Sequence, residues 1–162
     1  MNADIKECYK NVPKSVALSE ISEISVEKWQ TEWDQITKGK ITKEYFPVVA
    51  DRLNIRINIT HNFTSMVTGH GNIRSYLHRF KIIETQTCPC GTKTQAIDHL
   101  LFEFELLNKE RDILKSTVLK TDIWPIIKNR LIREYFKIFA KFTKEISFDK
   151  LNEVLHPPYQ VD

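Results

Sequence analysis

Glycine, cysteine and long apolar runs are all scarce in this chain of 162 residues. Four glycines beside abundant lysine, glutamate, leucine and isoleucine favour helices over a turn-rich sheet protein. No apolar run approaches the ~18 residues that a membrane-spanning helix needs. Three cysteines, two of them one residue apart, do not make a disulfide framework. The N-terminus lacks the apolar stretch of a secretory signal, so we expect an intracellular protein with no membrane partner.

Catalytic motifs are absent as well. The sequence contains no nucleophile elbow, no phosphate-binding loop, no zinc-protease motif and no aspartate pair of the polymerase type. We therefore expect no catalytic residues and no enzyme activity from this chain.

Length and composition predict one globular domain. Hydrophobic residues make up 41% and charged residues 28%, which is typical of a folded chain. The formal charge of +3 is unevenly placed: residues 109–150 hold eleven basic and six acidic side chains. A positive C-terminal part points to phosphate-bearing partners, whereas solvated helix faces are the commoner explanation.

Hydrophobic periodicity predicts a mostly α fold, an irregular bundle of five or six helices with a short CxCG knuckle-like turn. We expect residues 1–24 to be a leader or the remnant of an upstream domain, residues 25–151 to form a single helical domain, and residues 152–162 to be a tail. The expected helices cover residues 25–37, 42–53, 61–68 and 72–80, a segment that carries His99 and either breaks near 104–108 or continues to about 119, and residues 124–146.

The stretch from residue 68 to residue 104 holds a cluster of candidate metal ligands. Cys88, Cys90 and His99 have the spacing C-x-C-x8-H, in which a cysteine turn and a histidine on the next helix converge on zinc. A fourth ligand is expected at position 104, where the chain has Phe104, whose ring carbons cannot bind zinc. A turn with two reduced thiols and a core-facing histidine is the alternative without metal. Substitutes for the fourth ligand are Glu103, Glu105, His70 and His78.

Four short motifs follow one another in this stretch, and together they carry a family resemblance. They are Thr68-Gly69-His70-Gly71, Tyr76-Leu77-His78-Arg79-Phe80, Cys88-Pro89-Cys90-Gly91 and His99-Leu100-Leu101-Phe102-Glu103-Phe104. Residues from about 28 to 151 resemble the C-terminal tail, after the RNase H region, of insect non-LTR, LINE-type retrotransposon Pol (reverse transcriptase) proteins. In that family a cysteine stands where this chain has Phe104, so the resemblance implies that the segment 68–104 is a degenerate, zinc-knuckle-like segment.

The resemblance implies a non-catalytic accessory segment that helps to hold RNA or DNA near a polymerase. The polymerase, endonuclease and RNase H centres of the family lie outside the matching residues. Two alternatives stay open: a fragment of an RNA-directed DNA polymerase polyprotein, and a retrotransposon relic without a selected activity. Because Phe104 replaces the last cysteine, we expect no cofactor, with zinc bound weakly or not at all.

Two groups of side chains are candidates for nucleic-acid contact. In the expected helix 124–146, apolar residues at every third or fourth position should face the core: Ile127, Leu131, Tyr135, Ile138, Phe142 and Ile146. A row of positive side chains lies opposite them. It is equally consistent with binding to a phosphate backbone and with an ordinary solvated helix face. This basic row consists of Arg130, Arg133, Lys137, Lys141 and Lys144.

The second group lies next to the first histidines. His78 and Arg79 stand beside Tyr76 and Phe80, a mixture of cations and rings that is found in proteins that bind single strands. The ordinary explanation is that Phe80 is a core residue and Arg79 a surface residue.

Overall fold

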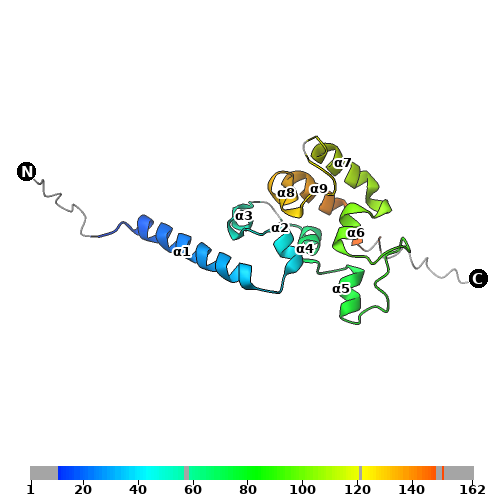
Figure 1. The fold of residues 1–162 in the computed structure, drawn as a ribbon, viewed down its shortest axis with the longest axis horizontal. Coiled ribbons are helices and arrows are strands. Elements are labelled where there is room, and N and C mark those ends of the chain that lie inside the picture. The colour runs from blue at the N-terminus through cyan, green and yellow to red at the C-terminus, as the bar shows by residue number, and fades with distance from the viewer. Residues whose placement is uncertain (1–10, 57–58, 121, 149–150, 152–162) are drawn as a thin grey trace, which may run out of the picture.

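The computed structural model describes residues 11–56, 59–120, 122–148 and 151, and these residues form a fold of short helices (Figure 1). The predicted mostly α, irregular bundle is confirmed, although its helices are more numerous than expected and several of them are shorter. Within the described residues, one bridge between Thr87 and Thr94 is the only β-type pairing, and no helix is both long enough and apolar enough to cross a bilayer. The elements are α1 (Lys14–Gln35), α2 (Lys40–Tyr45), α3 (Val49–Asn54), α4 (His61–Thr68), α5 (Arg74–Arg79), α6 (Ile97–Phe102), the 3-10 helix η1 (Glu105–Leu107), α7 (Asn108–Val118), α8 (Lys128–Arg133) and α9 (Phe136–Glu145).

The longest helix, α1, extends away from the other helices (Figure 1). It begins at Lys14, so part of the segment 1–24, expected to be a leader, is helical. Ser25, expected to start this helix, lies inside it, and its hydroxyl donates to a carbonyl one turn earlier at 2.6 Å. None of its residues is buried. Its C-terminal end is fastened by Trp33, whose indole N–H donates to the Phe46 carbonyl at 2.9 Å.

Local signals fixed α4 as predicted. The Thr60 hydroxyl accepts a hydrogen bond from the Phe63 N–H at 3.1 Å and caps the N-terminus. Gly69 ends the helix in the left-handed region, with φ 72°. A Cβ at this position would lie 2.5 Å from Ile41 Cδ1, the end of a flexible side chain, so the positive φ is the main reason for glycine here.

The prediction of one helix over residues 42–53 is wrong, because this segment forms parts of two helices. The chain leaves α2 after Tyr45 and enters α3 at Val49. Pro47 lies between them and has no N–H to continue a helix.

The prediction of a single helix over residues 124–146 is also wrong. Its first four residues are not helical, and a bend at Tyr135 (φ −114°, ψ 17°) separates α8 from α9. The Tyr135 hydroxyl donates to the Asp122 carboxylate at 2.8 Å, which holds the bend in place. Ile127, expected in the core, precedes α8 and is 70% exposed.

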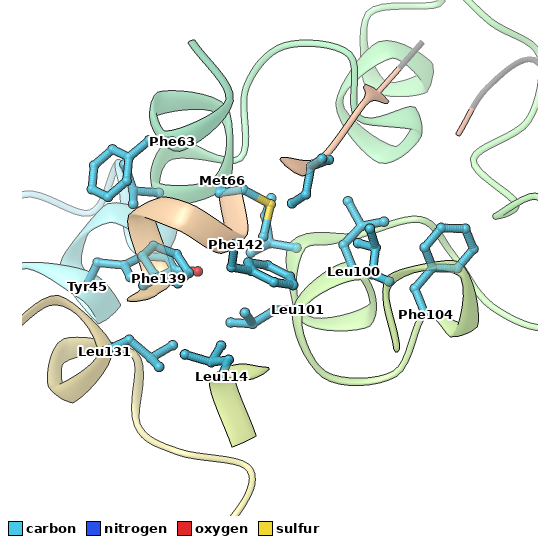
Figure 2. Close-up of a cluster of buried hydrophobic side chains, with 14 of the residues drawn as sticks. Tyr45, Phe63, Met66, Leu100, Leu101, Phe104, Leu114, Leu131, Phe139 and Phe142 are labelled. Atoms are coloured by element: carbon cyan, nitrogen blue, oxygen red, sulfur yellow. The ribbon is translucent and has the colours of Figure 1, made fainter. Parts of the chain in front are cut away.

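The hydrophobic core gathers around α9, which packs on α4, α7 and α8 (Figure 2). The Phe139 ring lies 5.6 Å from the Tyr45 ring of α2 and 5.8 Å from the Phe63 ring of α4, measured between centroids. Leu100 and Leu101 bring α6 to the same core and are fully buried. A core drawn from this many helices gives the chain a source of stability that does not require a metal ion.

The short helix α5 is capped from a distance. The helix expected over residues 72–80 begins at Arg74, and Ile73 is its N-cap. The first two N–H groups of the helix are satisfied by Gln95: the Arg74 N–H donates to its side-chain Oε1 at 2.9 Å, and the Ser75 N–H donates to its carbonyl at 3.2 Å. Gln95 is fully buried, so it anchors α5 to the segment that follows the CPCG turn.

A buried guanidinium closes the turn between α6 and α7. Arg111, in α7, is 2% exposed. Its Nε donates to the Leu101 carbonyl at 3.0 Å, and its Nη2 donates to the carbonyls of Leu100 at 3.3 Å and Phe104 at 2.6 Å. Desolvation lowers the pKa of Arg111, and nearby carboxylates partly offset that effect. The guanidinium thus satisfies carbonyls that the end of α6 leaves without a partner.

Replacing Arg111 should therefore destabilise the fold. We expect Arg111→Met to lower the free energy of unfolding by roughly 2–4 kcal/mol, because buried carbonyls lose a charged donor. Urea unfolding followed by circular dichroism measures this. The control Lys109→Met, at an exposed position on the same helix, should change stability by less than about 0.5 kcal/mol. Equal effects at the two positions would contradict this role for Arg111.

Candidate metal centre and basic surfaces

The segment Cys88-Pro89-Cys90-Gly91 forms the tight turn that its sequence predicts. The Gly91 N–H donates to the Cys88 carbonyl at 2.8 Å, and the Cys88 N–H donates to the Lys93 carbonyl at 2.7 Å. Gly91 has φ 75°, in the left-handed region that glycine adopts without strain. The bridge between Thr87 and Thr94 closes the segment into a short hairpin.

This hairpin faces α6, and the two elements bring together the three predicted metal ligands. The sulfur atoms of Cys88 and Cys90 and a ring nitrogen of His99 lie within 4.8 Å of one another. Cys90 Sγ is 3.3 Å from His99 Nε2. In a tetrahedral zinc site with bonds of 2.0–2.3 Å, ligand atoms lie roughly 3.5 Å apart, so a small contraction brings these three onto one ion.

Glu103 supports His99 from the other side. Its carboxylate lies 3.1 Å from His99 Nδ1 and accepts a hydrogen bond from Lys93 Nζ at 2.9 Å. The hydrogen bonds from Lys93 and His99 lower the pKa of this exposed carboxyl. A carboxylate on the second ring nitrogen orients a ligand histidine toward its metal. The spacing of four residues between His99 in α6 and Glu103 at its C-cap was the available sign of this role.

The fourth position of the cluster has no ligand among the described residues. Glu103 contacts the far side of the imidazole, and Glu105, His70 and His78 are not in the cluster. Phe104 is 1% exposed, and its ring centroid lies 5.6 Å from that of His99. The two thiols and the imidazole are groups that bind zinc. Beside them lies the packed ring of Phe104, at the position where the retrotransposon family that the chain resembles is expected to have a thiolate.

The two thiols differ in acidity. Desolvation raises the pKa of Cys88 to about 12 despite a hydrogen bond from the Cys90 backbone. Desolvation also opposes ionisation of Cys90, but hydrogen bonds from Thr92, Cys88 and His99 outweigh it and lower that pKa to about 6. In the metal-free chain, Cys90 is therefore the thiol that ionises near neutral pH.

The basic row of five side chains is divided between two helices, α8 and α9. Arg130 pairs with the carboxylates of Asp122 and Glu134. Arg133 lies 3.7 Å from the carboxylate of Asp51. Because the bend separates α8 from α9, these two arginines form local ion pairs instead of continuing a row.

The three lysines of the row remain together on α9. Lys137, Lys141 and Lys144 are spaced by four and three residues, which places them on one exposed face of the helix. Among the described residues, no carboxylate lies within ion-pair distance of any of them. We call them the α9 lysine row.

His78 and Arg79 lie at the C-terminal end of α5. His78 is half-buried and Arg79 is exposed. The Arg79 guanidinium carbon is 5.3 Å from the centroid of the Tyr76 ring and 5.0 Å from that of the Phe80 ring. Phe80, for which a core position was the ordinary explanation, is 55% exposed, so that explanation is wrong.

The native chain should retain well under one zinc per chain after dialysis against a chelator, and its helical circular dichroism should survive EDTA.

Restoring a thiolate at position 104 should create tight zinc binding. Phe104→Cys should lose roughly 3 kcal/mol without metal, because a core ring is removed, and regain stability with zinc. Melting temperatures in zinc and in EDTA measure this. Phe104→Ala is the matched control, since it loses the ring without gaining a ligand. Chelator-resistant, stoichiometric zinc in the native chain would contradict the expectation.

Cys90 should be alkylated selectively. In EDTA and a Cys8→Ser background, we expect iodoacetamide to modify Cys90 with a rate that rises through a midpoint near pH 6, because the thiolate is the nucleophile. Cys88 should stay unreactive at neutral pH, because it is buried and its pKa is about 12. Peptide mass spectrometry resolves the two sites. Thr92→Val removes one stabilising hydrogen bond and should move the midpoint upward, and equal reactivity of both thiols at pH 7 would count against this geometry.

Comparison with known proteins relates the chain to products of insect retrotransposable elements. It is 32% identical over 144 residues to the "Retrovirus-related Pol polyprotein from type-1 retrotransposable element R1" of Popillia japonica, which covers 83% of this chain and 56% of the relative. A protein of the same name from Bradysia coprophila is 32% identical over 100 residues, covering 59% of this chain and 10% of the relative. The "Putative 115 kDa protein in type-1 retrotransposable element R1DM" of Drosophila melanogaster is 27% identical over 97 residues, covering 57% of this chain and 9% of the relative.

The chain spans about a tenth to little more than half of the length of these relatives. No family model matches it, and no solved structure matches it. The resemblance predicted from the motifs between residues 68 and 104 is confirmed. The chain is a homologue of part of the Pol polyproteins of insect R1 retrotransposable elements.

Proposed function

We propose that this chain is a non-catalytic accessory segment, derived from a LINE-type retrotransposon reverse transcriptase, that binds RNA or DNA weakly inside the cell. The homology supports its origin in a retrotransposon. The lack of catalytic motifs in the sequence supports the non-catalytic part of the proposal. On this proposal the chain contributes affinity for a nucleic acid on which another part of the Pol protein acts.

The observation that carries the binding proposal is the α9 lysine row. Its three ammonium groups lie on one face of a rigid helix, while the opposite face, with Phe139 and Phe142, is fixed in the core. Lysines without a carboxylate partner are free to replace the counterions of a phosphate backbone. Arg130 and Arg133 should contribute less, because each lies in an ion pair with at least one carboxylate.

Neutralising the α9 lysine row should reduce both the affinity and its dependence on salt. For a labelled DNA duplex, we expect weak binding that is indifferent to sequence and falls steeply with salt. Changing Lys137, Lys141 and Lys144 together to glutamine should reduce the slope of log K against log salt by roughly 2–3. Fluorescence anisotropy titrations at several salt concentrations measure the slope.

A matched control removes the same amount of charge elsewhere. Changing Lys14, Lys28 and Lys38, which lie in or just after α1, to glutamine lowers the net charge equally and should leave most of the slope intact. If the two triple variants behave alike, the effect is one of net charge and not of the α9 lysine row. If the native chain binds no nucleic acid at low salt, the accessory proposal fails.

Two other proposals have their own support. The chain's share of its relatives' length favours a role as one part of a longer RNA-directed DNA polymerase polyprotein. Phe104, beside an otherwise assembled ligand cluster, favours a relic without a selected activity. Nucleic-acid binding that depends on the α9 lysine row would weigh against the relic.

A further inference from the structure

The end of α5 presents rings and cations together at the surface. We call Tyr76, Arg79 and Phe80 the α5 platform. The ring centroids of Tyr76 and Phe80 are 4.9 Å apart, and the Arg79 guanidinium lies over both rings. The His70 ring covers Tyr76 as well, at 4.8 Å. Tyr76 is therefore enclosed by its neighbours, whereas Phe80 is 55% exposed and has ring surface open to a ligand.

The backbone that follows the helix holds this ring in place. The Ile82 N–H donates to the Leu77 carbonyl at 3.0 Å, and the Lys81 N–H donates to the His78 carbonyl at 2.9 Å. This pair of bonds is the Schellman arrangement, in which glycine usually occupies the position after the cap. Here that position is Lys81, with φ 57°. The chain thus accepts backbone strain and keeps a cation directly after Phe80.

Two exposed cations accompany the exposed ring. Residues 69–83 contain Arg74, Arg79 and Lys81 and no aspartate or glutamate; Arg74 is buried, Arg79 and Lys81 are exposed, and Glu84 follows this segment. Figure 1 shows α5 at the edge of the molecule, apart from α8 and α9. The surface is therefore a cationic, aromatic site separate from the α9 lysine row.

We propose that the α5 platform binds an unpaired base of a single-stranded nucleic acid, with Phe80 as the contact ring. Every base has a π-face that stacks on an aromatic ring, and paired bases inside a duplex do not offer that face. Arg79 and Lys81 then bind the phosphates on either side of the stacked base. Tyr76 acts as a positioning residue, because its ring supports Phe80 and Arg79. This deepens the proposed function by naming the strand state of the ligand, and it rests on different residues.

The test compares a labelled 12-nucleotide oligothymidine strand with a labelled 20-base-pair duplex, using anisotropy and the full chain. Phe80→Leu keeps an apolar side chain but removes the ring, and it should weaken single-strand binding by roughly 5- to 100-fold, the range for loss of one stacked base. Duplex binding should change little. Phe80→Trp keeps a stacking surface and should retain single-strand affinity. Leu119→Ala, at an equally exposed apolar position (56%), should affect neither.

Lys81→Gly gives a second readout that loss of structure cannot imitate. Glycine relieves the left-handed backbone, so the melting temperature should rise. The same change removes a phosphate contact, so single-strand affinity should fall and its salt slope should decrease by about 0.7. A variant that is more stable and binds more weakly supports the platform. A variant that is more stable and binds with unchanged affinity shows that Lys81 does not bind a phosphate next to Phe80.

The outcomes separate the two proposals. Loss of single-strand binding in Phe80→Leu, with duplex binding kept, supports the α5 platform whatever the α9 lysine row does. If the native chain binds both ligands and Phe80→Leu changes neither, or changes both equally, the platform is overturned and the proposed function stands. If the native chain binds neither ligand at low salt, both are overturned.

Discussion

The candidate metal centre depends on one buried guanidinium, that of Arg111. A helix as short as α6 does not persist on its own, and its last carbonyls need donors from outside the helix. Arg111 supplies these carbonyls with donors and at the same time fixes Phe104, so that α7 follows in one defined direction. The position of His99 opposite the CPCG hairpin is therefore set from α7, a helix that contributes no ligand.

Features encoded within a few residues could be predicted from the sequence. The cap at Thr60 and the glycine at position 69 bounded α4, and the CPCG turn with Gly91 formed as expected. The cysteine and histidine spacing identified three groups that the structure brings together. Each of these features follows from the φ angle of a glycine or proline, from a side chain that bonds its own backbone, or from the periodicity of one helix.

Features that depend on distant partners could not be predicted. The apolar period of residues 124–146 continues across the bend, because α8 and α9 both face the same core. Nothing near Arg133 in the sequence indicates Asp51, and nothing near Asn72 indicates that Gln95 caps α5. The ion pair between Arg133 of the basic row and Asp51 could not be predicted for the same reason: only the fold brings that carboxylate close.

The attachment of α1 has a mechanical consequence. A helix of 22 residues is about 33 Å long, and only its last turns are fastened, through Gln30 to the Val49 N–H at 2.7 Å and through Trp33 to Phe46. Lys14, at the N-terminal end of α1, is therefore roughly one helix length from the turns that are fastened. Within the described residues, the helix is attached at its C-terminal end only. None of the residues of α1 is buried, so this spacing is set by the helix backbone and not by packing along its length.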